Sequence, residues 1–131
     1  MYELVLRTQF SAAHQLRAYH GKCEQLHGHN WDVEVVLTAS PNRSKSDKLP
    51  ASGMVIDFVE ARKIINRTIE KLDHKYLNEL PSFRKVNPTT EHLAKFIFDD
   101  LESRFSRRGI TIKRAGVWES SRAGAYYSAD S

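Results

Sequence analysis

Two segments near the start of the chain alternate apolar and polar residues, which is typical of strands with one buried face. In residues 2–14 the apolar set occupies even positions: Leu4, Leu6, Phe10 and Ala12. In residues 29–38 it occupies odd positions: Trp31, Val33, Val35 and Leu37. His14 has the parity of the first set, and His27 and His29 have the parity of the second. If the strands pair as antiparallel neighbours, the three histidines converge at one end and point the same way.

Two later segments repeat apolar residues every three to four positions, which indicates amphipathic helices. The first begins after Asp57, a suitable N-cap with Glu60 at the reciprocal position of a capping box. Its expected buried stripe is Phe58, Ala61, Ile64, Ile65, Ile69 and Leu72. The second begins after residues 87–88, with Thr89 as N-cap. Its expected buried stripe is Leu93, Phe96, Ile97, Leu101 and Phe105.

The C-terminal part predicts two closing strands over residues 110–118 and 123–128, joined by a turn at 119–122. Residues 40–53 contain many loop formers and predict an exposed loop. The element order is therefore strand, strand, helix, helix, strand, strand. This order favours an α+β fold with a four-stranded antiparallel sheet and two helices on one face. The open edges of such a sheet favour assembly into a closed ring.

Size and composition predict one domain over residues 1–131, because 131 residues with 40% hydrophobic content build one modest core. The chain starts without the pattern of a secretory signal and contains no apolar run long enough to cross a bilayer. We therefore expect a cytoplasmic protein without membrane contact. The single cysteine, Cys23, cannot form an internal disulfide.

The formal net charge of +4 suits an anionic partner such as a phosphorylated metabolite or a nucleic acid. Charge alone is explained more simply by a solvated basic surface. The sequence shows no interleaved aromatic and basic pattern of the kind that binds nucleic acid, so we expect no nucleic-acid partner.

The convergent histidines point to a metal, because neutral imidazoles are zinc ligands and burying several imidazoles together otherwise costs several kcal/mol. A His-x-His pair suits a strand, where residues two apart share a face. Cys23 lies four residues before His27. It can complete a closed, structural zinc module, or it can be a reactive thiol beside an open, catalytic site. The residues alone leave both alternatives open.

Four further polar residues carry weaker signals. Asp73 and His74 form an acid–base pair at the expected end of the first helix, where stabilisation of the helix end is the simpler interpretation. Glu119 at a strand end and Glu91 in a first helical turn, each taken alone, are typical solvated carboxylates.

Several segments together resemble the 6-pyruvoyl-tetrahydropterin synthase family. They are residues 10–14 (FSAAH), 23–30 (CEQLHGHN), 53–58 (GMVIDF), 72–74 (LDH), 87–91 (NPTTE) and Glu119. The resemblance covers nearly the whole chain in the same order. It implies the tunnelling fold and a homohexamer built from two trimers.

The resemblance also implies roles for single residues. His14, His27 and His29 become the Zn²⁺ ligands, and Cys23 becomes a general base instead of a fourth ligand. Asp73 and His74 become its proton-relay partners. Glu119 is expected to accept hydrogen bonds from the guanidine-like edge of a pterin ring, assisted by Thr89, Thr90 and Glu91. The implied substrate is 7,8-dihydroneopterin triphosphate.

The product depends on the segment around Cys23. Three residues separate Cys23 from His27, a spacing similar to that of the bacterial 6-carboxy-5,6,7,8-tetrahydropterin synthases of queuosine biosynthesis, which release triphosphate and acetaldehyde. Glu24 directly after Cys23 is a departure, similar to relatives that cleave the same substrate toward a folate precursor. The implied activity is a zinc-dependent lyase forming 6-carboxy-tetrahydropterin, with 6-pyruvoyl- or 6-hydroxymethyl-pterin formation as alternatives.

Overall fold

Five strands form one sheet in the computed structural model, which describes residues 1–18, 25–39 and 49–129. The strands are β1 (Leu4–His14), β2 (His27–Ala39), β3 (Lys75–Tyr76), β4 (Ile110–Ser120) and β5 (Ala123–Tyr127). Their order across the sheet is β3-β1-β2-β4-β5. The four long strands pair antiparallel, as the alternation predicted, and β3 adds a two-residue parallel pairing to β1.

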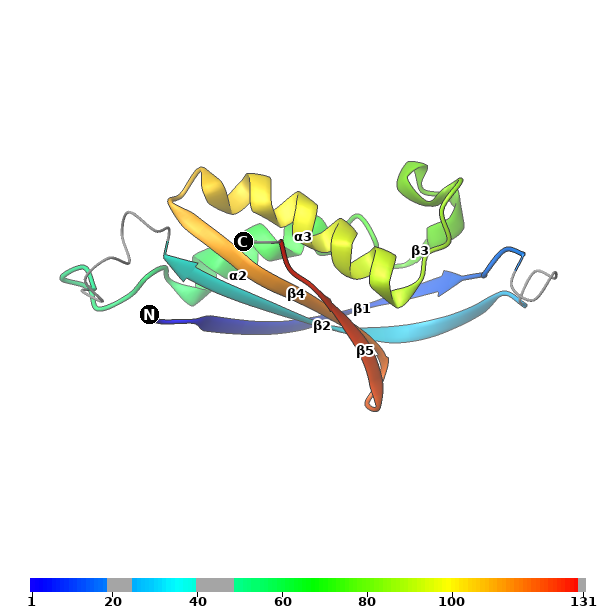
Figure 1. Ribbon diagram of the computed structural model, residues 1–131, viewed down its shortest axis with the longest axis horizontal. Coiled ribbons are helices and arrows are strands. Elements are labelled where there is room, and N and C mark those ends of the chain that lie inside the picture. Colours follow the sequence, from blue (N-terminus) through cyan, green and yellow to red (C-terminus); the bar gives the residue numbers. More distant parts are fainter. Residues whose placement is uncertain (19–24, 40–48, 130–131) are drawn as a thin grey trace.

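Both helices cover the same face of this sheet (Figure 1). The first, α2 (Phe58–Ile69), begins where the Asp57 side chain accepts a hydrogen bond from the Val59 amide at 2.7 Å. The second, α3 (Thr90–Ser106), begins where Thr89 accepts from the His92 amide. The two predicted N-caps are therefore confirmed, and with them the α+β arrangement of two helices on one sheet face.

The core lies between the helices and the inner face of the sheet. It contains the predicted apolar residues of β1 and β2 except Leu4, which is only partly buried, together with most of the two helical stripes. Phe58 is an exception: its prediction as a core residue is wrong, because it stands in the first turn of α2 and is 58% exposed. Ile64 and Phe96 are only partly buried at the margin of the core.

The segment between the helices contains structure that the sequence pattern did not predict. After β3, two short 3₁₀ helices follow, η1 (Leu77–Glu79) and η2 (Pro81–Phe83). These elements lie beside the end of β1 (Figure 1). The predicted four-stranded sheet thus gains a fifth, parallel edge strand. It was missed because two residues are too few to show an alternation.

Candidate metal centre

The pairing of β1 with β2 brings the three histidines together. His14 lies directly opposite His27, and Ala12 lies opposite His29. Antiparallel pairing keeps these residues on one face, as predicted, and the face is the one that carries the core. The ligand-type atoms of the three side chains all lie within 4.8 Å of one another.

Two of the three rings are fixed by backbone carbonyl groups. His14 Nδ1 lies 2.9 Å from the Pro88 carbonyl oxygen, and His27 Nδ1 lies 2.8 Å from the Gln25 carbonyl oxygen. A carbonyl oxygen only accepts, so each Nδ1 carries the proton and each neutral ring has its lone pair on Nε2. The two Nε2 atoms lie 3.0 Å apart. With both rings neutral in this tautomer, two acceptors face each other, and either a shared proton or a metal ion between them relieves the repulsion.

The third ring adds a further unsatisfied nitrogen. His29 Nε2 is buried and has no hydrogen-bond partner among the residues that the structure describes. Its nearest charged neighbour is Glu119 Oε2 at 3.7 Å, which is too long for a hydrogen bond. A buried nitrogen without a partner costs about 1–3 kcal/mol, a cost that a bound cation removes.

The donor set fits a divalent metal that prefers nitrogen ligands. Nitrogens about 2.0–2.1 Å from a tetrahedral zinc are roughly 3.3 Å from one another, so small ring rotations convert the observed spacing into a ligand set. Each Nδ1 bond to a carbonyl fixes the tautomer that places the lone pair on Nε2, as second-shell partners of metal-bound histidines do. The triad is therefore a site that can hold a metal ion.

The environment of His14 favours the neutral form of its imidazole. Burial lowers the pKa of His14 below its ordinary value, against the hydrogen bond to Pro88, which raises it. The neighbouring His27 and His29 act in the same direction as burial. Metal binding requires the neutral ring, so the pocket favours the form that a metal needs.

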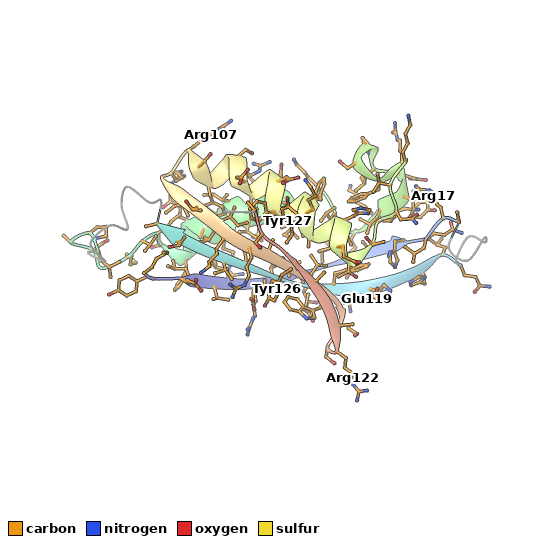
Figure 2. All side chains as sticks on the ribbon, viewed as in Figure 1. Arg17, Arg107, Glu119, Arg122, Tyr126 and Tyr127 are labelled. Carbon is orange, nitrogen blue, oxygen red and sulfur yellow. The ribbon has the colours of Figure 1, made fainter. Side chains whose placement is uncertain are left out.

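The loop before α3 reaches the triad through Pro88. Thr89 and Thr90 follow at the N-terminus of α3 and are partly buried, while Glu91 is exposed in the first turn. Glu119 lies near the end of β4 (Figure 2), and its Oε2 is 3.7 Å from His29 Nε2. Of the predicted substrate-binding residues, Glu119 thus lies close to the triad, and Thr89, Thr90 and Glu91 directly follow Pro88, whose carbonyl contacts His14.

Asp73 and His74 lie beside the outer edge of β1. Asp73 Oδ1 accepts from the Ser11 amide at 2.9 Å, and this bond holds the pKa of the Asp73 carboxyl below its usual range. His74 has a left-handed backbone with φ of 58°, and its Nδ1 lies 3.0 Å from Asp73 Oδ2. The His74 side chain is 81% exposed. It lines the same shallow hollow as His29, but no hydrogen bond joins the pair to the triad within the described part of the chain.

Two predicted residues, Cys23 and Glu24, lie outside the described residues. Three residues without a predicted role make hydrogen bonds close to the triad. Asn78 and Asn87 bond to the segment that follows His14, and this segment includes Arg17 (Figure 2). In sequence, asparagines beside prolines and short helices are typical turn residues. Only Asn87 could have been singled out, because it lies within the NPTTE segment that resembles the family.

A family model described as 6-pyruvoyl tetrahydropterin synthase matches residues 3–130. The chain belongs to this enzyme family. The match spans the strands that carry the histidines, the loop before α3, and Glu119.

Relatives within the family carry different names. A protein of Archaeoglobus fulgidus with a provisional assignment as 6-carboxy-5,6,7,8-tetrahydropterin synthase is 36% identical over 114 residues, covering 87% of this chain and 84% of the relative. The dihydroneopterin monophosphate aldolase of Pyrococcus furiosus is 29% identical over 121 residues, covering 92% of each. Similarity in sequence thus places the chain in the family but does not distinguish synthase activity from aldolase activity.

A solved structure supports the fold. The 6-pyruvoyl tetrahydropterin synthase of Caenorhabditis elegans superposes with a TM-score of 0.77 at 22% identity, covering 98% of this chain and 96% of that one. The tunnelling fold that the sequence resemblance implied is thereby confirmed. No helix among the described residues is long and apolar enough to cross a membrane.

Proposed function

We propose that this protein is a zinc-dependent lyase that converts 7,8-dihydroneopterin triphosphate to 6-carboxy-5,6,7,8-tetrahydropterin, with loss of triphosphate and acetaldehyde. One observation carries the metal part of the proposal. The Nδ1 atoms of His14 and His27 are committed to carbonyl oxygens, so their Nε2 lone pairs face each other across 3.0 Å. A bound zinc held by His14, His27 and His29 would supply Lewis-acid stabilisation of negative charge on substrate oxygens.

The proposed recognition of the pterin ring uses Glu119. A carboxylate can accept two hydrogen bonds from the adjacent N–H groups of a guanidine-like edge. Glu119 suits this role because it lies 3.7 Å from His29, which would set the ring beside the metal, and because its side chain is 41% exposed and accessible. Thr89, Thr90 and Glu91 would assist from the N-terminus of α3.

The proposed proton transfers use Cys23 and His74. Cys23 would remove a carbon-bound proton from the substrate side chain, and His74, paired with Asp73, would exchange protons with the reacting oxygens. The His74 side chain is 81% exposed and forms its ion pair with Asp73. The proposed homohexamer, a dimer of trimers, would allow it to serve the site of a neighbouring subunit. A cytoplasmic location remains a prediction.

The relatives have names that imply different products, so the product is proposed from further features of the sequence. The three-residue spacing between Cys23 and His27 supports the 6-carboxy product, and so does the provisional name of the Archaeoglobus fulgidus relative. The second candidate is aldolase-type cleavage to 6-hydroxymethyl-dihydropterin. Glu24 beside Cys23 and the similarity to the Pyrococcus furiosus aldolase favour this candidate. Formation of 6-pyruvoyl-tetrahydropterin is the third.

Mass analysis of the products from dihydroneopterin triphosphate distinguishes the three candidates, because the carboxy-, hydroxymethyl- and pyruvoyl-pterins differ in mass. The zinc-loaded wild type is expected to yield the 6-carboxy product. Glu24→Gln, run in parallel, is expected to retain this product and lose any hydroxymethyl side product. A wild type that yields only hydroxymethyl-pterin would contradict the proposed product and support the second candidate.

A further inference from the structure

The outer edge of β1 is paired along the stretch that leads to the metal centre. The Ser11 carbonyl accepts from the His74 amide at 2.6 Å, and the Ser11 amide donates to Asp73. The next two residues, Ala12 and Ala13, pair with β3 in parallel register. The segment that follows α2 therefore runs alongside β1 up to His14.

Two asparagine side chains continue this pairing beyond His14. Asn78 Oδ1 accepts from the Gln15 amide at 2.9 Å, and Asn78 Nδ2 donates to the Gln15 carbonyl at 2.7 Å. Asn87 makes the same two bonds to Arg17, at 2.8 and 3.1 Å. A side-chain amide offers one acceptor and two donors, so it can substitute for a neighbouring strand. The clamped residues are two apart, which is the strand period.

The two asparagines differ in the hydrogen bonds that their backbone carbonyls accept. The Asn87 carbonyl accepts from His92 Nδ1 at 2.7 Å and from the Thr89 amide at 2.8 Å, so it is tied to the first turn of α3. The next residue is Pro88, whose carbonyl accepts from His14 Nδ1 at 2.9 Å. Asn87 therefore joins the backbone three residues after His14 to the carbonyl that orients the His14 ring.

We propose that Asn87 is a positioning residue of the metal centre: it holds the Pro88 carbonyl where it fixes the tautomer and orientation of His14. This inference rests on the proposed metal function. The bond that leaves Nε2 free for a metal depends on a carbonyl in a loop, and the side chain of Asn87 anchors that loop to the strand carrying His14.

Asn78 offers a matched control within the same edge. It is buried and makes the same pair of side-chain bonds to β1's extension, yet no hydrogen bond connects it to Pro88 or to the triad in the described part of the chain. Removing either clamp costs two hydrogen bonds, those to Gln15 in the case of Asn78 and those to Arg17 in the case of Asn87. Only removal of the Asn87 clamp releases the carbonyl partner of His14.

The test compares Asn87→Ala with Asn78→Ala in the full chain. Zinc affinity is measured by competition with a chromogenic chelator, the ligand field by the visible absorption of the Co²⁺-substituted protein, and fold by thermal unfolding of the metal-free form. We expect Asn87→Ala to bind zinc about 10–100-fold more weakly, the usual effect of losing a second-shell partner, and to shift the Co²⁺ bands. We expect Asn78→Ala to unfold at lower temperature but to keep the zinc affinity and Co²⁺ spectrum of the wild type.

A gentler substitution keeps the test decisive if Asn87→Ala does not fold. Asn87→Ser keeps a polar side chain that is too short to make both bonds to Arg17 directly but that can bond to it through water, so a smaller loss of zinc affinity is expected. Unchanged affinity and spectrum in the folded Asn87 variant would overturn the positioning role, and so would an equal loss in Asn78→Ala. A wild type that binds no zinc would instead contradict the proposed function itself.

Discussion

His14 and His27 face each other across the β1–β2 pair with their Nε2 atoms 3.0 Å apart. Their Nδ1 protons are directed at the Pro88 and Gln25 carbonyl oxygens. The pair therefore has two convergent lone pairs, and a third buried nitrogen, His29 Nε2, lies nearby. The suitability of this site for a metal ion therefore depends on the backbone carbonyls as much as on the histidines.

Loss of one histidine is expected to abolish metal binding. His27→Ala removes one of three ligands, and two imidazoles bind zinc far more weakly than three. We expect the zinc content of the purified protein to fall from one per chain to near zero, measured by plasma emission spectrometry. His74→Ala is the control, because His74 lies outside the triad; it should keep full zinc and lose turnover. Full zinc occupancy in His27→Ala would contradict the ligand assignment.

Replacement of Cys23 separates catalysis from metal binding. If Cys23 is the base, Cys23→Ala should keep zinc and fold while turnover falls by at least about 10²-fold, the lower range for loss of a general base. The measurements are zinc content, thermal unfolding and steady-state turnover of dihydroneopterin triphosphate. Normal turnover would eliminate Cys23 as the base, and loss of zinc would indicate a fourth ligand.

The convergence of the histidines was predictable from sequence because it depends only on strand parity and antiparallel pairing. His14 has the parity of the buried residues of its strand and His27 that of the buried residues of the next strand, so antiparallel pairing of these neighbours brings the two side chains to one face. The N-caps Asp57 and Thr89 were predictable for a similar reason, since capping is a local interaction. These features need no knowledge of distant contacts.

The carbonyl partners of the histidines were not predictable, because they depend on where the chain returns. Pro88 lies 74 residues after His14 in sequence, and nothing in its own segment indicates a contact with a strand. The clamps of Asn78 and Asn87 are equally non-local. Phe58 failed as a core residue because helical periodicity gives the face of a helix but not where that face ends.

The two N-caps offer a test of how the α3 terminus serves the site. Thr89→Ala and Asp57→Ala each remove one capping bond, so each should lower the free energy of unfolding by about 1 kcal/mol in urea denaturation. Thr89 adjoins Pro88, whereas Asp57 caps the other helix. We expect Thr89→Ala alone to raise the KM for dihydroneopterin triphosphate. Equal KM values in both variants would contradict a role for Thr89 in substrate binding.

Asp100 of α3 forms hydrogen bonds to α2 and to the residues that follow it, and we expect these bonds to be lost in acid. It accepts from Thr68 Oγ1 at 2.5 Å, Lys71 Nζ at 2.9 Å and Arg104 Nε at 3.1 Å. Burial raises the pKa of this carboxyl, but the three bonds together outweigh burial and hold the pKa below its ordinary value. A lowered folded-state pKa adds stability above the unfolded-state pKa, and this stability is lost as the pH falls through the folded-state value.

Asp100→Asn is therefore expected to lower the free energy of unfolding by about 2 kcal/mol at pH 7 and to flatten its decline below pH 4. Urea denaturation of both proteins between pH 7 and pH 3 measures this difference. The matched control is Asp99→Asn, which removes an exposed pair with Lys95 and should change stability by less than about 0.5 kcal/mol. A constant difference between Asp100→Asn and wild type across this range would contradict the expected loss of these bonds in acid.

The coordination shell of the bound metal distinguishes an open three-histidine centre from a closed shell that includes Cys23. X-ray absorption at the zinc edge of the zinc-loaded, substrate-free wild type reports the number and type of ligands. For an open three-histidine centre we expect three imidazole nitrogens at about 2.0–2.1 Å, one oxygen from water and no sulfur. A sulfur scatterer at about 2.3 Å would place Cys23 on the metal as part of a closed structural module. That result, or fewer than three imidazoles, would contradict an open three-histidine catalytic centre.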